Sequence, residues 1–385
     1  MKASPFAAFP AITLRGRHAS QRFFFPAAAL FAALGPWLLL GIYLPGMPAV
    51  DIATHARGML FGYVGALIAG YLGGRLLTRQ LLTLFGLWLA GRWAEITPSG
   101  ALVTQLLYAG FGLYLAIIVA PRFTAAKKWR NRMIAPLLIA IACFPLLLLV
   151  AGMLRLAPLL SLHSLLLLIC LLMFFMGGRF ITPLLARAYA NRGATLPHRV
   201  QPALEGTVML LLLVAAILDL AGTDSRWTSL PTGAAGLLLC LRLLRWRLPW
   251  RGLEQAALVA MGYGYLWLGL GLVVFSLSLA GLLPVTASLH VITIGALGTL
   301  SSTVMLKFSH APGNAPARVH QLVVVLLSVA VLARFLAPML SAYYRELLTL
   351  AATLWSVNFL LVGGTVLLAN RSKPPGACSH PRSPA

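Results

Sequence analysis

Long apolar stretches alternate with short polar ones along nearly the whole chain. Each apolar stretch holds about 20 residues, the length that a helix needs to cross a hydrocarbon core of roughly 30 Å. Polar residues do not occupy every second position within them, so helices are predicted and not the strands of a barrel. The predicted spans are residues 23–44, 58–77, 81–96, 101–120, 133–154, 159–177, 206–221, 230–244, 256–283, 287–306, 319–340 and 347–369. The sequence therefore predicts an all-α, polytopic transmembrane bundle of about 12 spans, of which the third and eighth are short.

Composition agrees with a lipid environment. Hydrophobic residues make up 60% of the chain, charged residues only 10%, and the mean hydropathy is +0.90. Soluble domains are about 45–50% apolar and about 25% charged. A water-soluble fold of this composition would have no interior large enough for its apolar side chains.

The basic residues predict how the bundle is oriented. The chain carries 30 Lys and Arg against 7 Asp and Glu, a formal net charge of +23. Most of these cations lie in the two tails and in alternate connections between spans, for example at residues 122–132 and 179–199. Cytoplasmic loops of membrane proteins carry such an excess, so both termini are expected in the cytoplasm of a bacterium, with the bundle in its inner membrane. This placement also explains the charge without a nucleic-acid partner.

The polar parts of the chain are too short for a further domain. The longest connection, residues 178–205, cannot bury a core of its own. Residues 1–22 and 371–385 are predicted to be disordered cytoplasmic tails, and residues 23–370 a single transmembrane domain. No internal repeat is evident. The cysteines are scattered without a Cys-x-x-Cys pair, which argues against a disulfide framework, a zinc ribbon or a covalently attached c-type haem; they are Cys143, Cys170, Cys240 and Cys378.

The start of the second span combines a histidine, a methionine and a series of small residues. Met59 follows His55 by four residues, so on a helix an imidazole and a thioether share one face and could bind one metal ion. Arg57 lies beside them and could pair with an anion such as a haem propionate, or extend to the lipid headgroups. Small residues recur every four positions and predict a ridge for close helix packing; they are Gly58, Gly62, Ala66, Gly70 and Gly74.

Histidines at the ends of other spans extend this group. His290 and, as a weaker candidate, His163 begin spans that enter from the same predicted outer face as the span of His55, so the three imidazoles are expected at similar depth. His310 ends the span that His290 begins, about 20 residues or roughly 30 Å away, so these two cannot bind one metal ion. Imidazole is a common ligand of haem iron and of copper. The other histidines, His18, His198, His320 and His380, fall in tails or inner loops and are expected to be solvated.

Several segments in the same order resemble the NnrS family of membrane proteins. The matching segments are residues 55–72, 87–92, 177–183, 264–272, 289–299 and 309–316. At the first of them the family usually reads His-Ala-His-Glu-Met, where this chain reads His-Ala-Arg-Gly-Met at 55–59. A family His stands where this chain has Gly262, and a family Arg where it has Met305.

The resemblance implies a haem- and copper-containing membrane protein linked to nitric oxide, nitrosative stress and denitrification. Haem b is expected because no covalent attachment motif exists. The family positions that this chain keeps are His55, Met59, His290 and His310, and the pair His55 and His290 is the expected haem site. Two other interpretations stay open: a secondary transporter, because twelve spans with cytoplasmic ends are a common carrier layout, and a cofactor-free scaffold or assembly protein.

Overall fold

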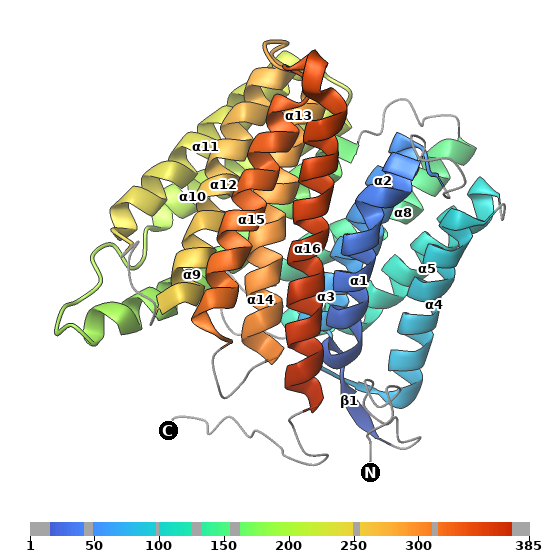
Figure 1. Cartoon of the computed structure of the whole chain (residues 1–385), viewed down its shortest axis with the longest axis horizontal. Helices are drawn as coiled ribbons and strands as arrows, with labels where there is room; N and C mark the ends of the chain where they lie inside the picture. The colour runs from blue at the N-terminus through green and yellow to red at the C-terminus, as the bar shows by residue number, and fades with distance from the viewer. Residues whose placement is uncertain are drawn as a thin grey trace.

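The computed structural model describes residues 16–41, 49–97, 100–124, 132–154, 162–248, 255–309 and 315–371. These residues form twelve long helices and a small two-stranded antiparallel sheet (Figure 1). The first half comprises β1 (Arg17–Ala19), α1 (Gln21–Leu40), α2 (Ile52–Arg57), η3 (Gly58–Tyr63), α3 (Val64–Leu72), β2 (Arg75–Leu77), α4 (Thr78–Ile96), α5 (Ala101–Val119), α6 (Pro121–Thr124) and α8 (Ile134–Met153). The second half comprises α9 (Leu162–Ala190), α10 (Pro202–Leu220), α11 (Ser225–Trp246), α12 (Ala256–Leu279), α13 (Val285–His290), η6 (Val291–Gly298), α14 (Thr299–Ser309), α15 (Ala317–Leu336), η7 (Ser341–Tyr343) and α16 (Tyr344–Arg371).

The described helices bear out the predicted membrane bundle. Eleven of them are long and apolar enough to cross a membrane. The twelfth long helix, α4, falls short because its 19 residues include the charged side chains of Arg79, Arg92 and Glu95. It runs beside α5 along the bundle nonetheless (Figure 1). Twelve passes place both ends of the bundle on one side, where the Asn370 amide at the end of α16 donates to the Arg22 carbonyl at the start of α1, at 3.4 Å.

Part of the predicted amino-terminal tail is ordered. Residues 17–19 form β1, which pairs antiparallel with β2 in the turn after α3. The Ser20 amide donates to the carbonyl of Gly74 at 2.8 Å, and Gly74 adopts a positive φ of 57° that favours glycine. Residues 17–20 of this predicted tail are therefore held by hydrogen bonds to β2 and to Gly74. Residues 1–15 and 372–385 lie outside the described residues.

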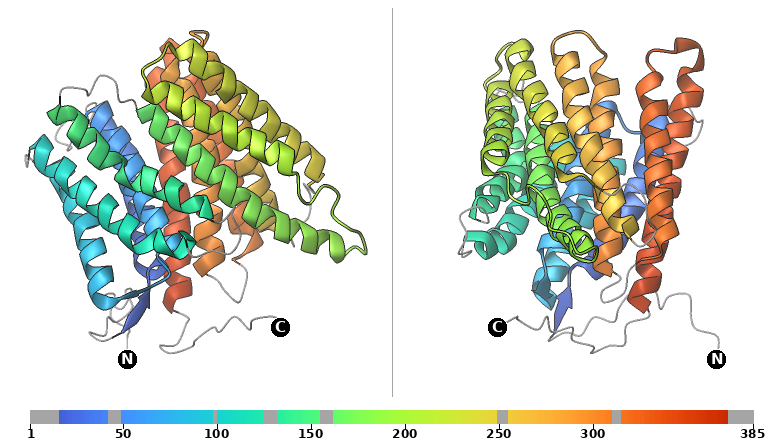
Figure 2. Two further views of the ribbon diagram at one scale, coloured as in Figure 1. Left: turned by 180° about the vertical axis from the view of Figure 1, so that it is seen from behind. Right: turned by 90° about the vertical axis from the view of Figure 1, so that its left-hand side faces the viewer.

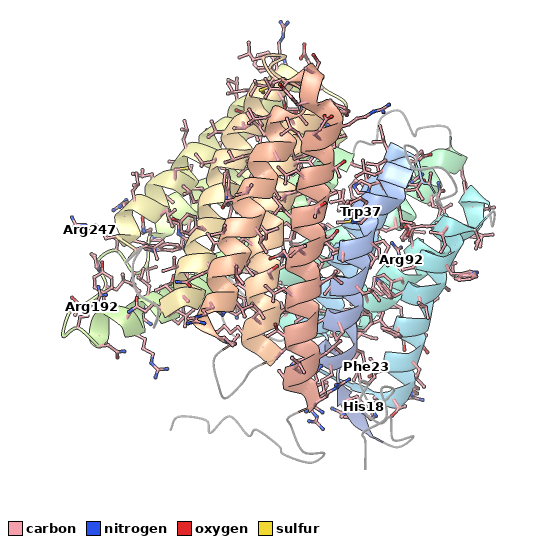
Figure 3. All side chains as sticks on the ribbon, viewed as in Figure 1. His18, Phe23, Trp37, Arg92, Arg192 and Arg247 are labelled. Atoms are coloured by element: carbon pink, nitrogen blue, oxygen red, sulfur yellow. The ribbon has the colours of Figure 1, made fainter. Side chains whose placement is uncertain are left out.

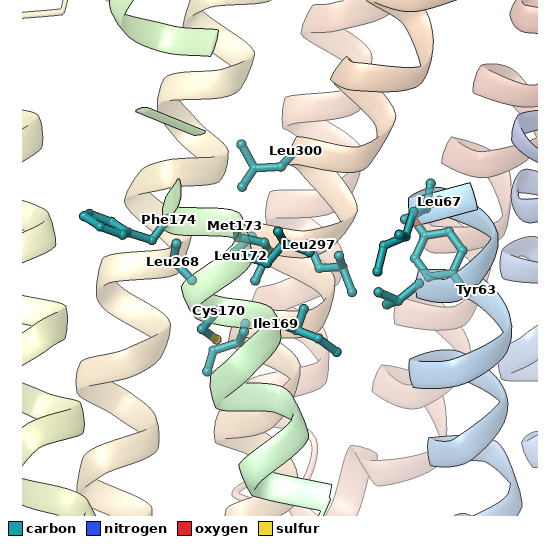
Figure 4. Close-up of a cluster of buried hydrophobic side chains, with 14 of the residues drawn as sticks. Tyr63, Leu67, Ile169, Cys170, Leu172, Met173, Phe174, Leu268, Leu297 and Leu300 are labelled. Atoms are coloured by element: carbon teal, nitrogen blue, oxygen red, sulfur yellow. The ribbon is translucent and has the colours of Figure 1, made fainter. Parts of the chain in front are cut away.

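The helices form two groups, α1–α8 and α9–α16, that pack along a common side (Figure 2). Helix α1 lies against α16, and the Trp355 indole donates to the Ala32 carbonyl at 2.7 Å. The Tyr63 hydroxyl in η3 lies 2.5 Å from that of Ser301 in α14. Between the groups, apolar side chains from α3, α9, α12, η6 and α14 fill the centre (Figure 4). The two groups are thus joined by both apolar packing and buried hydrogen bonds.

Candidate functional site

His55 lies in the second turn of α2, at the end of the bundle opposite the chain termini (Figure 1). Asp51 caps this helix by accepting from the Thr54 amide at 2.6 Å, and this hydrogen bond holds the pKa of Asp51 below its usual value. The His55 Nδ1 lies 3.2 Å from the Gly35 carbonyl oxygen of α1. A carbonyl can only accept, so Nδ1 carries the hydrogen and the lone pair is on Nε2.

His290 has the same arrangement at the end of α13. Its Nδ1 lies 2.6 Å from the Thr286 carbonyl oxygen one turn earlier, so again Nδ1 donates and Nε2 keeps the lone pair. Histidines that bind metals usually donate their other ring N–H to a carbonyl or carboxylate, which fixes the tautomer and the ring orientation. Both imidazoles therefore make the backbone hydrogen bond that metal-binding histidines usually make.

The structure brings the two histidines together with an arginine. Arg334 interacts electrostatically with both His55 and His290. The two imidazoles also interact electrostatically with each other. Arg334 is in the last turn of α15, and its Nη1 is buried with no hydrogen-bond partner. The sequence analysis gave this arginine no role. Its position beside the histidines depends on how α15 packs, which no local pattern encodes.

A small pocket opens beside His55. Its volume is about 10 Å³, the space of roughly one water molecule. The lining includes Thr54, His55, Met59 and Glu95 together with apolar residues of α1. Met59 thus faces the same pocket as His55, and its sulfur lies close to Gly35, where a side chain would collide with it.

A buried ion pair lies behind the pocket. Arg92 Nη1 is 2.8 Å from a Glu95 oxygen and 3.3 Å from the Gly58 carbonyl. The guanidinium stacks over the rings of Phe31 and Tyr108, at 4.9 and 4.5 Å from their centroids. Glu95 Oε1 is buried without a hydrogen-bond partner in the described structure. Figure 3 places Arg92 inside the bundle between α1 and α4, unlike Arg192 and Arg247 at the periphery.

The sequence analysis missed Glu95 as an acid at membrane depth. Arg and Glu three residues apart on one helix are neighbours. The spacing Arg92-x-x-Glu95 inside an apolar span was therefore a usable signal for a buried ion pair.

Both histidine helices contain a π-helical segment. In the helix of residues 52–72, η3 begins three residues after His55, and in that of residues 285–309, η6 begins directly after His290. π-Helical turns are rare, and they occur frequently at functional sites. This feature singles out the same two helices as the histidines do.

The other sequence candidates lie apart from this pair or are not described. Arg57 is half-buried and its Nη2 lies 3.4 Å from the Thr54 hydroxyl. His163 faces α10 and α12 instead, with Nδ1 3.8 Å from an Asp219 oxygen and its ring against Phe275. His310 lies outside the described residues. Within the described ranges, no group of three or more His, Cys, Asp or Glu side chains gathers in a way that could hold a metal ion.

Comparison with known proteins gives one match. The family profile described as NnrS protein matches residues 18–369, nearly the whole chain. No curated protein and no solved structure matches it. The match covers both histidine helices and all twelve long helices except the end of α16. The chain belongs to the NnrS family.

Proposed function

We propose that this protein is a bacterial inner-membrane haem protein of the nitric oxide response, with haem b bound through His55 and His290. The observation that carries the proposal is the pair itself. Two imidazoles from helices distant in the sequence lie within electrostatic range of each other, and each has its Nδ1 hydrogen on a backbone carbonyl, which leaves the lone pair on Nε2. Such a pair could hold the iron of a haem.

The surrounding charges suit the anionic edge of a haem. Arg334 offers a buried nitrogen without a partner, and Arg57 lies half-buried one turn from the pocket. Arginine pairs readily with carboxylates, so these two side chains are the proposed partners of the propionates. These residues fit a haem through the kinds of group that they offer, imidazole for the iron and guanidinium for the propionates. The pocket beside His55 is smaller than a haem, and two of its lining residues, Leu38 and Val50, flank residues 42–48, which the structure does not describe.

Bound haem would supply an iron centre that binds nitric oxide. The residues of this chain have separate roles in that proposal: the imidazoles hold the iron, and Phe31, Leu38 and Val50 make the adjoining pocket largely apolar.

Copper is a second candidate metal, favoured by Met59. Thioether and imidazole together suit copper, and both face one pocket. Copper bound at His55 and Met59 would need no macrocycle. Metal content therefore has to be measured beside the haem spectrum.

The test is purification from membranes in mild detergent, followed by an absorption spectrum and iron and copper analysis. Wild type should show a haem band that shifts on addition of nitric oxide. His55→Ala and His290→Ala should each lower the haem content or change the spin state, because each removes a proposed ligand of the iron. His163→Ala is the matched control and should leave the spectrum unaltered. Copper lost with Met59→Ala and no haem in wild type would favour the second candidate.

A wild type without either metal would reject the proposal. The two remaining interpretations, a secondary transporter and a cofactor-free scaffold, would then need separate tests. Orientation can be tested independently with reporter fusions at residues 127, 192 and 371, which should read cytoplasmic because of the cation excess.

A further inference from the structure

A second pocket lies between α12 and α15, toward the end of the bundle that carries the chain termini. Its volume is about 210 Å³. Helix α12 contributes one face with residues spaced by three and four positions, and α15 contributes two adjacent positions in each of two turns. The lining residues are Ala256, Val259 and Tyr263 from α12, and His320, Gln321, Val324 and Val325 from α15.

A hydrogen bond joins the two helices just beyond the pocket. One turn beyond Tyr263 and Val324, the Trp267 indole donates to the Ser328 hydroxyl at 3.2 Å and ties α12 to α15. The space is therefore a slot about two helical turns deep, roughly 10 Å at 1.5 Å per residue.

His320 is a wall of this slot and not a solvated loop residue. The sequence analysis expected it in an inner loop, but it is the fourth residue of α15 and only 3% exposed. Its place in a pocket, beside Gln321 and across from Tyr263, gives it a setting in which a ligand can be recognised.

The slot opens sideways to lipid. Val325 lines it and is 57% exposed, and the neighbouring Leu322 and Val329 on α15 are exposed as well. Exposed apolar side chains on a membrane helix face the acyl chains. A ligand would therefore enter from the bilayer and would have to be lipid-soluble.

The lining chemistry narrows the ligand further. The described residues that line the slot include no Asp, Glu, Lys or Arg, which disfavours a phosphate headgroup. Tyr, His and Gln can each donate and accept hydrogen bonds, so they can bind a carbonyl and equally a hydroxyl in its place. A cavity of about 150 Å³ holds a benzene ring, so this slot has room for a substituted six-membered ring.

We propose that the slot between α12 and α15 binds the headgroup of a lipid quinone. Tyr263, His320 and Gln321 supply the hydrogen bonds to its two oxygens, while Val259 and Val324 pack on the ring. The tail lies along the exposed valines and leucines of α15. This assignment is independent of the haem proposal, because the slot is at the other end of the bundle from His55 and His290.

The test is equilibrium dialysis of the detergent-purified full chain with ubiquinone-1, against detergent alone. Wild type should bind saturably. Val259→Trp fills the slot and should weaken binding at least tenfold. Val329→Trp is the matched control: it makes the same change on the lipid face of α15 outside the slot and should bind as wild type does. Equal thermal unfolding of the two variants shows that folding is not the cause.

The hydrogen-bonding role is tested by Tyr263→Phe and Gln321→Leu. Each removes one bond to the ring oxygens and should weaken binding about fivefold, equivalent to about 1 kcal/mol. Unchanged affinity in both, with loss only in Val259→Trp, would identify the slot as an acyl-chain groove and overturn the quinone assignment. Uptake by wild type no greater than by detergent alone would overturn it too.

Discussion

Two arginines are buried among the described residues, Arg92 and Arg242, and the protein accommodates them in similar ways. Each guanidinium has a carboxylate within 3 Å, at 2.8 Å from Glu95 and at 2.6 Å from Glu205 respectively. Each stacks on aromatic rings: Arg92 on Phe31 and Tyr108, and Arg242 on Phe174, Trp246 and Tyr265. Pairing and stacking together lower the high cost of a charge in a low-dielectric interior.

The two clusters differ in which helices supply the carboxylate. Glu95 is on the same helix as Arg92, three residues later, and lines the pocket of His55. Glu205 comes from α10, while Arg242 is on α11 and donates to the Tyr265 hydroxyl of α12 at 2.6 Å. The Arg242 cluster therefore connects three helices, whereas the Arg92 cluster holds a carboxylate in place beside the candidate site. An arginine–glutamate pair thus stabilises helix packing at Arg242 and positions a carboxylate beside a pocket at Arg92.

The largest effect is expected from Arg242→Met. It leaves Glu205 without its cation and separates three helices, so the free energy of unfolding should fall by about 3–5 kcal/mol, the usual cost of breaking a buried pair. Thermal unfolding in detergent measures it. The control is Arg245→Met, three residues along on the exposed face of α11, which should change stability little. Equal losses in the two variants would contradict an architectural role for Arg242.

Arg92→Met should cost less, about 2–3 kcal/mol, because the ion pair that it breaks lies within one helix and does not join two. It should also disturb the candidate site, since Glu95 lies against the His55 pocket. At equal amounts of folded protein, Arg92→Met should alter the haem spectrum and Arg242→Met should not. Arg79→Met, on the exposed end of the same helix, is the control. A normal spectrum in Arg92→Met would remove the distinction between the clusters.

Gly62→Ala tests the Arg92 cluster from its other side. A side chain at Gly62 would run into the Arg92 guanidinium, so overpacking by about 1–3 kcal/mol is expected. Gly86→Ala on α4 meets nothing within 4 Å and should be neutral or slightly stabilising, because alanine favours helix. Unfolding temperatures in detergent compare them, and a stable Gly62→Ala would show that Arg92 can move aside.

The smallest difference in stability is expected between Tyr265 and Tyr108, whose rings each lie against one of the two buried guanidinium groups. Tyr265→Phe removes a hydrogen bond to Arg242 and should cost about 1 kcal/mol. Tyr108→Phe should cost nothing or stabilise, because that hydroxyl is buried with no hydrogen-bond partner in the described structure. Both variants keep the ring under the guanidinium. Chemical denaturation at matched detergent concentration resolves a difference of this size, and the reverse order would contradict the assigned contacts.

The helical bundle could be predicted from the sequence because lipid demands a simple signal, an apolar stretch of fixed length. Even α4 was found that way, despite its three charges. The second-span ridge was predicted less well. Its glycines face different helices, with Gly58 near Glu95 of α4 and Gly70 against Phe25 of α1, so they do not form one contact surface.

The candidate site could be predicted only in part. His55 and His290 begin spans on one face of the membrane, and the sequence gives that depth directly. Arg334 and the α12–α15 slot depend on which helices become neighbours, and spacing within a helix carries no such information. Ion pairs within one helix, such as Arg92 with Glu95, lie between these cases.

The π-helical segments make the direction of the side chains in each helix depend on its exact number of residues. An i to i+5 hydrogen bond accommodates one more residue in a turn than the α-helix does. That extra residue rotates everything before it by about 100° relative to everything after it. In the helix of residues 52–72, it lets His55 meet the Gly35 carbonyl of α1 while Tyr63 meets Ser301 of α14. Deleting one residue from η3 would keep His55 and Tyr63 but rotate one of them away from its partner. The direction of the imidazole therefore depends on the number of residues in this helix as well as on their identity.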